Sequence, residues 1–301
     1  MRTLSGGPHE VVGVDIERSP FTGVVGSIAD RAFVDACMHG VDAVLHAATL
    51  HKPHVATHTR QDFVDTNITG TLNLLEAAVR NKVRAFVFTS TTSTFGDALT
   101  PPRGAPAAWI TEDVVPIPKN IYGTTKVAAE DLCQLFHRNE KLPCLVLRTS
   151  RFFPEEDDVP EKRASFEDAN LKANEFLYRR VDIEDVVSAH LLALVRAPEL
   201  GFGKFIVTAT TPFTREDVQQ LGIDAAAVLK RRIPSYEAIY AARGWKMLPM
   251  LDRVYINERA RSLLGWKPHY DFQHVLNRVS AGLDPRSELS QVIGSKGYHP
   301  G

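Results

Sequence analysis

Residues 84–96 read Arg-Ala-Phe-Val-Phe-Thr-Ser-Thr-Thr-Ser-Thr-Phe-Gly. The apolar part predicts a buried strand at 84–90, because aromatic and β-branched residues favour strands. Hydroxyl side chains follow at its carboxyl end, which borders the ligand crevice in a doubly wound parallel sheet. Strand and helix patterns alternate on either side of this stretch, so the sequence predicts an α/β fold with helices on both faces of the sheet. The other predicted strands are 10–14, 43–47 and 144–149, and the predicted helices are 30–38, 60–80 and 122–138.

A tyrosine and a lysine lie four residues apart in the third of these helices, at Tyr122 and Lys126. This spacing puts the two side chains on one helix face, one turn from each other. A free tyrosine has a pKa of about 10 and is a poor base at neutral pH, but a nearby ammonium group favours the phenolate. The pair can therefore move a proton on or off a substrate hydroxyl. The Tyr/Lys spacing alone occurs often by chance. The upstream strand that ends in hydroxyl residues supports the interpretation of the pair as a catalytic one.

Composition narrows the class of protein. The chain has 301 residues, 44% of them hydrophobic, which predicts one large domain with a small satellite. The net charge is −1 and no basic stripe is present, so we expect no nucleic-acid partner. No apolar run approaches 20 residues and no signal peptide is evident, so we expect a cytoplasmic protein without membrane association. Three scattered cysteines predict free thiols; they are Cys37, Cys133 and Cys144.

Further motifs follow one another along the chain: Val11-Val12-Gly13-Val14-Asp15, Gly26-Ser27-Ile28-Ala29-Asp30, Asp42-Ala43-Val44-Leu45-His46-Ala47-Ala48, Asn67-Ile68-Thr69-Gly70-Thr71, Leu145-Val146-Leu147-Arg148, Val181-Asp182-Ile183-Glu184-Asp185-Val186-Val187 and Leu264-Gly265-Trp266-Lys267-Pro268. Together with the hydroxyl strand and the Tyr/Lys pair, they resemble the extended short-chain dehydrogenases/reductases. Within that class they resemble the NAD-dependent epimerase/dehydratase family, which includes nucleotide-sugar epimerases. The resemblance extends to about Leu276. It implies a Rossmann-like doubly wound sheet, a small helical substrate lobe, NAD as cofactor, a small-molecule substrate and a homodimer.

The resemblance also implies three catalytic residues, Thr91, Tyr122 and Lys126. Tyr122 would be the acid/base, and Thr91 would hydrogen-bond the reacting hydroxyl or carbonyl. Lys126 would lower the pKa of Tyr122 and hydrogen-bond the nicotinamide ribose. An alternative is that Thr91 only packs at the strand end and that Ser90 or Thr92 is the active hydroxyl.

Asp15 is expected to accept hydrogen bonds from the adenosine ribose, and its charge favours NAD over NADP. Asn67 either braces the strand and loop near the nicotinamide or caps a helix. The full set of expected cofactor contacts is Asp15, Ser27, Ile28, Ala47, Ala48, Asn67, Thr89, Tyr122, Lys126 and Ser150.

One family element is missing. Family members open with a strand, a Gly-x-x-Gly-x-x-Gly loop and a helix, which bring backbone N–H groups to the cofactor pyrophosphate. The acidic residue normally follows that loop by about 20 residues, yet only fourteen residues precede Asp15. Residues 1–4 read instead as the end of the first helix, with Gly6 and Gly7 as its stop.

Three explanations stand beside each other: a start assigned too far downstream, a truncation, or a divergent member that works without the loop. We expect the first. The missing strand lies in the middle of the sheet in this fold, so its loss leaves strand edges unpaired, and no compensating change is evident.

The expected substrate residues are Thr92, His51 and Arg151. Arg151 stands where sugar epimerases of the family carry a substrate-binding asparagine. Arginines suit a phosphate or a carboxylate. We expect Arg151, Arg179 and Arg180 to form ion pairs instead, with Glu155, Glu156 or Asp185.

We expect no metal site. The histidines that cluster in the sequence have no cysteine or carboxylate among them and lack the spacing of a compact ligand set. They are His46, His51, His54 and His58. His46 belongs to a strand motif, and we expect it in the core.

The predicted dinucleotide-binding domain comprises residues 1–150 and about 181–208, with strands near 181–183 and 204–208. The substrate lobe comprises about 151–180 and 209–283, mostly helical, and 284–301 is a tail. The predicted function is that of an NAD-dependent oxidoreductase or epimerase acting on a hydroxyl-bearing substrate. A carbonyl reductase or hydroxysteroid-type dehydrogenase is the second enzyme interpretation. A non-catalytic binding protein that lost its cofactor loop is the third interpretation.

Overall fold

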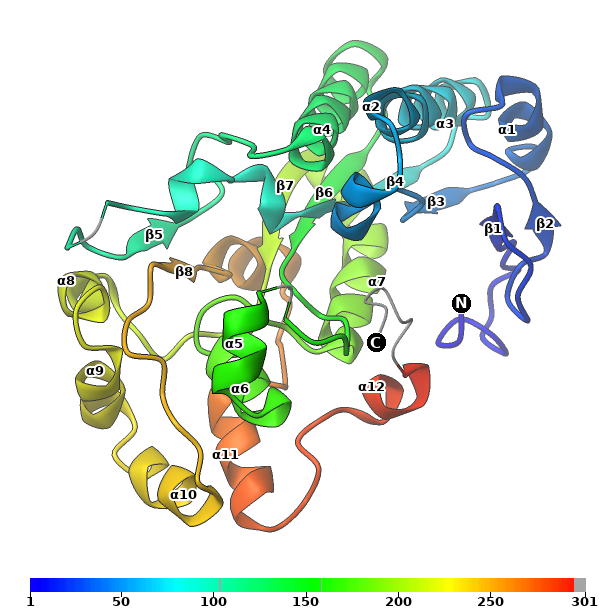
Figure 1. Ribbon diagram of the computed structural model, residues 1–301. Helices are drawn as coiled ribbons and strands as arrows, with labels where there is room; N and C mark the ends of the chain where they lie inside the picture. Colours follow the sequence, from blue (N-terminus) through cyan, green and yellow to red (C-terminus); the bar gives the residue numbers. More distant parts are fainter. Residues whose placement is uncertain (103, 158, 295–301) are drawn as a thin grey trace. The chain divides into compact units, whose positions relative to one another are not determined.

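The computed structural model describes residues 1–102, 104–157 and 159–294. Its main sheet has four strands in the order β3-β4-β6-β7, and β3 pairs with β4 in parallel (Figure 1). The strands are β3 (Ala43–His46), β4 (Ala85–Thr91), β6 (Cys144–Thr149) and β7 (Phe202–Val207). The predicted α/β fold with a Rossmann-like parallel sheet is confirmed.

The chain divides into two compact units. Unit 1 consists of Met1–Thr94, Pro118–Leu147 and His190–Lys204, and unit 2 of Phe95–Ile117, Arg148–Ala189 and Phe205–Gly301. The functional division into a dinucleotide-binding domain and a substrate lobe stays a prediction.

Helix α4 (Ile121–Glu140) carries the Tyr/Lys pair in unit 1. It begins because the side chain of Asn120 accepts a hydrogen bond from the Gly123 N–H, and it ends at Lys141 in a left-handed conformation. Its inner face buries Ala129 and Cys133 in the core formed with strands β4 and β6. Other helical elements of this region are α1 (Arg31–Cys37), η1 (Lys52–Ala56), α2 (Arg60–Phe63), η2 (Val64–Thr69), α3 (Gly70–Arg80) and η3 (Thr92–Thr94).

The sheet of unit 1 is interrupted. Strands β1 (Val14–Asp15) and β2 (Val24–Val25) pair in parallel as a sheet of their own, and no described strand joins β1 to β3. Large apolar side chains on or beside these strands are exposed, including Val12, Ile16 and Leu45. Within the described residues, β1 and β2 are therefore not hydrogen-bonded to the main sheet. Residues 1–5 form a hydrogen-bonded turn rather than a regular helix, and Gly6 follows with φ of 82°.

Unit 2 contains a second core, which includes Trp245, Val254 and Phe272. Its elements are η4 (Asp97–Leu99), β5 (Ala108–Ile110), α5 (Pro160–Ser165), α6 (Asp168–Glu175), η5 (Arg215–Asp217), α8 (Val218–Leu221), α9 (Ala225–Arg232), α10 (Tyr236–Arg243), β8 (Arg253–Tyr255), η6 (Ala260–Leu264), α11 (Phe272–Ser280) and α12 (Glu288–Ile293). Helix α7 (Ile183–Leu200) belongs to unit 2 up to Ala189 and to unit 1 from His190 on.

Three predictions about these elements need correction. No strand forms near 181–183: Arg151 and Arg180 make only an isolated bridge, and Ile183 already begins α7. The five prolines between Pro101 and Pro118 predict a loop there, but this stretch contains β5, which pairs in parallel with β8. The expected tail holds helix α12, capped by the Ser287 side chain. The remainder of that tail, 295–301, lies outside the described residues.

Asp185 illustrates how burial competes with hydrogen bonding in unit 2. Its carboxylate accepts hydrogen bonds from the backbone N–H groups of His269 (2.9 and 3.0 Å) and Tyr270 (2.9 Å). Burial nevertheless raises the pKa of Asp185 to about 6, because it penalises the charged form more than these bonds favour it.

We expect Asp185→Asn to flatten the pH dependence of stability between about pH 4 and 6. An unfolded aspartate has a pKa of about 3.9, so in this window the folded state binds more protons than the unfolded state. Stability therefore falls as pH rises. Urea unfolding of both proteins at pH 4, 5 and 6 measures the difference, and equal pH slopes would contradict the prediction.

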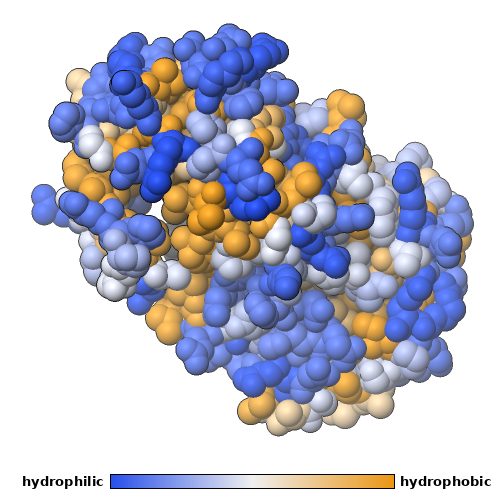
Figure 2. Space-filling view, turned by 180° about the vertical axis from the view of Figure 1, so that it is seen from behind, coloured by the Kyte–Doolittle hydropathy of each residue, from blue (hydrophilic) through white to orange (hydrophobic). Residues whose placement is uncertain are grey.

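The surface seen in Figure 2 is mainly hydrophilic and is interrupted by apolar patches. Within the part of the chain that the structure describes, no helix is long and apolar enough to cross a membrane.

Candidate active site

The end of β4 and the first turn of α4 bring together the three predicted catalytic residues, all in unit 1. The hydroxyl of Thr91 hydrogen-bonds that of Tyr122, and the Thr91 oxygen also accepts from the Ser93 N–H at 3.1 Å. The ammonium of Lys126 donates to the Thr89 carbonyl at 2.7 Å. Gly123 allows α4 to lie close to the backbone that follows β4, because a Cβ at this position would stand 3.0 Å from the Ser93 carbonyl oxygen.

Burial dominates the ionisation of the pair. It raises the pKa of Tyr122 to about 12, against the opposing effect of the Thr91 hydrogen bond. Burial also lowers the pKa of Lys126 to about 7, with Glu130 and then Cys133 acting in the other direction. The predicted lowering of the Tyr122 pKa by Lys126 is therefore not found in this structure, in which the ammonium donates to the Thr89 carbonyl.

The contacts of Ser90 argue against it as the active hydroxyl. Ser90 donates to the Glu130 carboxylate at 2.6 Å, and Glu130 lies two helical turns beyond Tyr122 on α4. Thr92 opens the short helix η3 and is buried. Thr91 is the residue that hydrogen-bonds Tyr122.

Asn67 braces the loop after β3 and does not cap a helix. It is buried inside η2, where its side-chain oxygen accepts from the Thr49 hydroxyl (2.9 Å) and the Leu50 N–H (2.8 Å). Its amide nitrogen donates to the Leu50 carbonyl (2.9 Å) and to the Thr125 hydroxyl on α4 (3.0 Å). Asn67 therefore ties this loop to the helix that carries Tyr122.

His46 is a core histidine, as predicted. Its Nε2 lies 2.9 Å from the Thr71 hydroxyl, which itself donates to the Asn67 carbonyl. Nε2 must therefore carry the proton in this bond. Burial and then the charge of Lys126 lower the pKa of His46 to about 3, so the ring is neutral. His51 begins η1 in the same loop, and its ring stacks edge-on against His54. The described residues contain no group of three or more potential metal ligands.

The predicted cofactor contacts fit the nicotinamide half of a dinucleotide better than they fit its adenosine and pyrophosphate parts. Thr89, Tyr122 and Lys126 converge at one strand end, and the Thr89 hydroxyl also meets His190 Nε2 at 2.8 Å. In unit 2, the buried Ser150 hydroxyl has no partner among the described residues.

On the adenosine side, Asp15 is exposed and accepts only the Glu17 N–H. Ile28 is buried, while Ala47 and Ala48 are exposed after β3. The Ser27 hydroxyl accepts the Ala29 N–H at 3.2 Å. No glycine-rich loop for the pyrophosphate occurs among the described residues.

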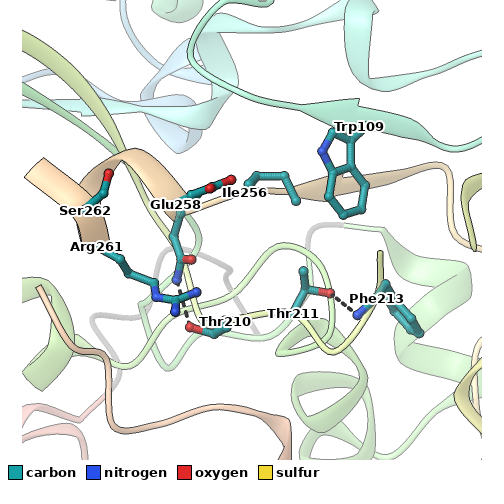
Figure 3. Close-up of a pocket in the computed structure, with 9 residues that line it drawn as sticks. Trp109, Thr210, Thr211, Phe213, Ile256, Glu258, Arg261 and Ser262 are labelled. Atoms are coloured by element: carbon teal, nitrogen blue, oxygen red, sulfur yellow. Dashed lines mark hydrogen bonds between the residues drawn. The ribbon is translucent and has the colours of Figure 1, made fainter. Parts of the chain in front are cut away.

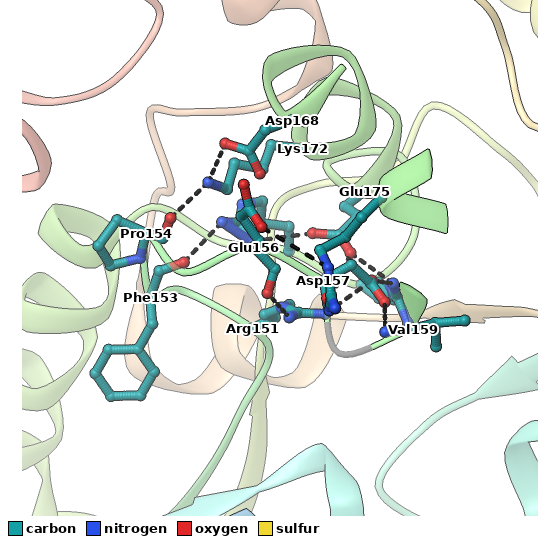
Figure 4. Close-up of polar contacts among 12 residues, drawn as sticks. Arg151, Phe153, Pro154, Glu156, Asp157, Val159, Asp168, Lys172 and Glu175 are labelled. Atoms are coloured by element: carbon teal, nitrogen blue, oxygen red, sulfur yellow. Dashed lines mark hydrogen bonds and ion pairs between the residues drawn. The ribbon is translucent and has the colours of Figure 1, made fainter. Parts of the chain in front are cut away.

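The three arginines of unit 2 form ion pairs, as expected, and two carboxylates outside the expected set take part in them (Figure 4). Asp157 pairs with Arg151 (2.9 Å) and Arg179 (2.6 Å). Glu175 pairs with Arg179 (2.5 Å) and Arg180 (3.0 Å). The sequence did not predict these two carboxylates as partners, because the pairing joins the segment at Asp157 to Glu175 on α6 through tertiary packing.

Unit 2 also contains a pocket of about 430 Å³ (Figure 3). None of the predicted site residues lines it. The Asn257 amide donates to the Thr208 carbonyl and the Thr210 hydroxyl at its wall. The lining residues are Trp109, Thr210, Thr211, Phe213, Ile256, Asn257, Glu258, Arg261 and Ser262.

Comparison with known proteins places the chain in a class. Residues 1–204 match the profile of the NAD dependent epimerase/dehydratase family. The chain therefore belongs to this family of extended short-chain dehydrogenases/reductases, as the order of its motifs predicted.

Two relatives match along most of their length. A UDP-glucose 4-epimerase of Rhizobium leguminosarum bv. trifolii is 27% identical over 83% of this chain and 80% of its own. A dTDP-glucose 4,6-dehydratase of Streptomyces antibioticus is 28% identical over 86% and 75%. Among solved structures, a short-chain dehydrogenase/reductase superfamily protein of Agrobacterium tumefaciens with bound NAD is 25% identical over 93% of this chain and 91% of its own, with a TM-score of 0.63.

Proposed function

We propose that this chain oxidises and reduces a hydroxyl-bearing carbon of a nucleotide sugar, as an epimerase or a dehydratase, with NAD as the cofactor. The observation that carries the proposal is the meeting of Thr91, Tyr122 and Lys126 at one strand end. Relatives named for UDP-glucose and dTDP-glucose support the substrate class.

In this mechanism Tyr122 reacts as the phenolate: its own phenol proton leaves to solvent first, and the phenolate oxygen then takes the proton of the substrate hydroxyl. The Thr91 hydroxyl, already bonded to Tyr122, orients the same substrate oxygen. Bound NAD supplies a hydride acceptor that can return the hydride in the same cycle. Lys126 would hold the nicotinamide ribose, and its charge would stabilise the Tyr122 phenolate as the proton moves. Burial of both side chains excludes water from this transfer.

We propose the substrate contacts Thr92 and His51, which follow β4 and β3 in unit 1. We propose a structural role for Arg151, which its ion pair with Asp157 supports. We further propose NAD over NADP, because the exposed carboxylate of Asp15 would repel a 2′-phosphate.

A non-catalytic binding protein is the second candidate. Its support is the interrupted sheet and the absence of a glycine-rich loop among the described residues. Dinucleotide binding separates the two candidates, because only the enzyme needs it.

We expect NAD to raise the melting temperature of the chain and NADP to raise it less, because Asp15 favours the unphosphorylated ribose. Asp15→Asn should reduce this difference between the two cofactors. Thermal shift measures the binding, and chromatography of UDP-glucose and dTDP-glucose incubated with the NAD-loaded protein measures turnover. No shift with either cofactor and no conversion would favour the non-catalytic candidate.

A further inference from the structure

The Lys126 ammonium is buried in an environment with little to balance its charge. Its side chain is 2% exposed, and its Nζ donates to the neutral Thr89 carbonyl. Nζ also lies 4.0 Å from the centre of the Phe88 ring, whose face attracts a cation. Neither neighbour carries a negative charge, so these contacts alone leave a desolvated cation without a counter-ion.

Glu130 lies one turn further along α4, on the same helix face as Lys126. It is fully buried, at 0% exposure. One carboxylate oxygen accepts from the Ser90 hydroxyl at 2.6 Å, and the other lies 3.2 Å from the Lys204 ammonium on β7. These two contacts favour the ionised form of Glu130 in the core.

Other polar groups surround this pair. Helix α4 adds the Cys133 thiol, and β3 adds the neutral ring of His46. Asp131 is exposed, and its Oδ1 lies 3.6 Å from the Nζ of Lys204. Glu130 is therefore the buried carboxylate among the described groups that act on Lys126.

We propose that Glu130, fixed by Ser90 and Lys204, is a positioning residue that keeps the buried Lys126 ammonium charged at neutral pH. The proposal rests on the function proposed above, in which that charge serves Tyr122 and the nicotinamide ribose. Sequence spacing offers one signal for this role, an acidic residue four positions after the lysine on an otherwise apolar helix face.

The direction of the effect follows from the competition at Lys126. Burial lowers the pKa of Lys126 to about 7, and the charge of Glu130 opposes this lowering. Removal of that charge moves the pKa further down, so Lys126 loses its proton at a lower pH. Any activity that needs the ammonium then declines at lower pH than in the wild type.

The test compares Glu130→Gln with Asp131→Asn, two variants that remove one negative charge from adjacent positions of the same helix. We expect the titration midpoint of Lys126 to fall by about one pH unit or more in Glu130→Gln, a typical effect of a close charge. It should stay unchanged in Asp131→Asn. The measurement is NMR of 13C-labelled lysine side chains, with the Lys126 signal assigned from its loss in Lys126→Met.

This titration needs neither cofactor nor substrate, so it stands even where the proposed activity fails. An unchanged Lys126 midpoint in Glu130→Gln would overturn the proposal, and a purely structural role would lower the melting temperature without moving that midpoint. If Glu130→Gln does not fold, Glu130→Asp keeps the charge but withdraws it from Lys126. Glu130→Asp should lower the titration midpoint of Lys126 by a smaller amount than Glu130→Gln. An unchanged Lys126 midpoint in Glu130→Asp would also overturn the proposal.

Discussion

Tyr122→Phe is expected to abolish turnover and to leave NAD binding nearly intact. The substitution removes only the hydroxyl that takes the substrate proton, and the ring stays in its buried place. Loss of a general acid/base typically costs 10²–10⁴-fold in rate. We expect a fall of at least about a hundredfold in kcat, measured with saturating cofactor and nucleotide sugar.

The cofactor affinity of the same variant is expected to stay close to that of the wild type. The proposed ribose contact is made by Lys126, whose ammonium donates to the Thr89 carbonyl and not to Tyr122. NAD titration of Tyr122→Phe should therefore give a Kd close to the wild-type value. Tyr236→Phe is a matched control, because Tyr236 lies in helix α10 of unit 2 and its hydroxyl makes only a long 3.3 Å contact to the Ala226 carbonyl. Full turnover by Tyr122→Phe would refute the catalytic assignment.

Local patterns predicted most of the sheet. The strands expected at 43–47, 84–90 and 144–149 and the helix expected at 122–138 all form, with ends displaced by at most two residues. The strands are apolar runs of four to seven residues and the helix has one buried face, so local sequence patterns indicate them. The motif order also predicted which strand end and which helix turn meet at Thr91 and Tyr122.

What escaped prediction depends on distant parts of the chain. Strand β5 exists because Ala108 pairs with Arg253, and no local pattern encodes that register. Burial raises the pKa of Tyr122, and this burial depends on how deeply α4 packs against β4, which the Tyr/Lys spacing does not encode. The sequence did not predict the buried contacts of Glu130, because its contact with Lys204 joins α4 to β7.

Glu175→Gln is expected to be the most destabilising single change in the ion-pair cluster of unit 2. Glu175 has 2% of its side chain exposed, and its carboxylate faces Arg179, Arg180 and, at 3.6 Å, Arg151. Asp157 is a second carboxylate of the cluster, and it pairs with Arg151 and Arg179. The amide keeps the shape of the side chain but removes the negative charge that faces these three guanidinium groups.

Breaking a buried ion pair by removing one partner typically costs about 3–5 kcal/mol, because the remaining charge stays desolvated. We expect a loss of that order in the free energy of unfolding, measured by urea denaturation at pH 7. Glu156→Gln is the matched control. That side chain is 64% exposed and lies 3.8 Å from Arg163, so its loss should change stability by less than about 1 kcal/mol. Equal stability of the two variants would mean that water reaches the cluster and screens its charges.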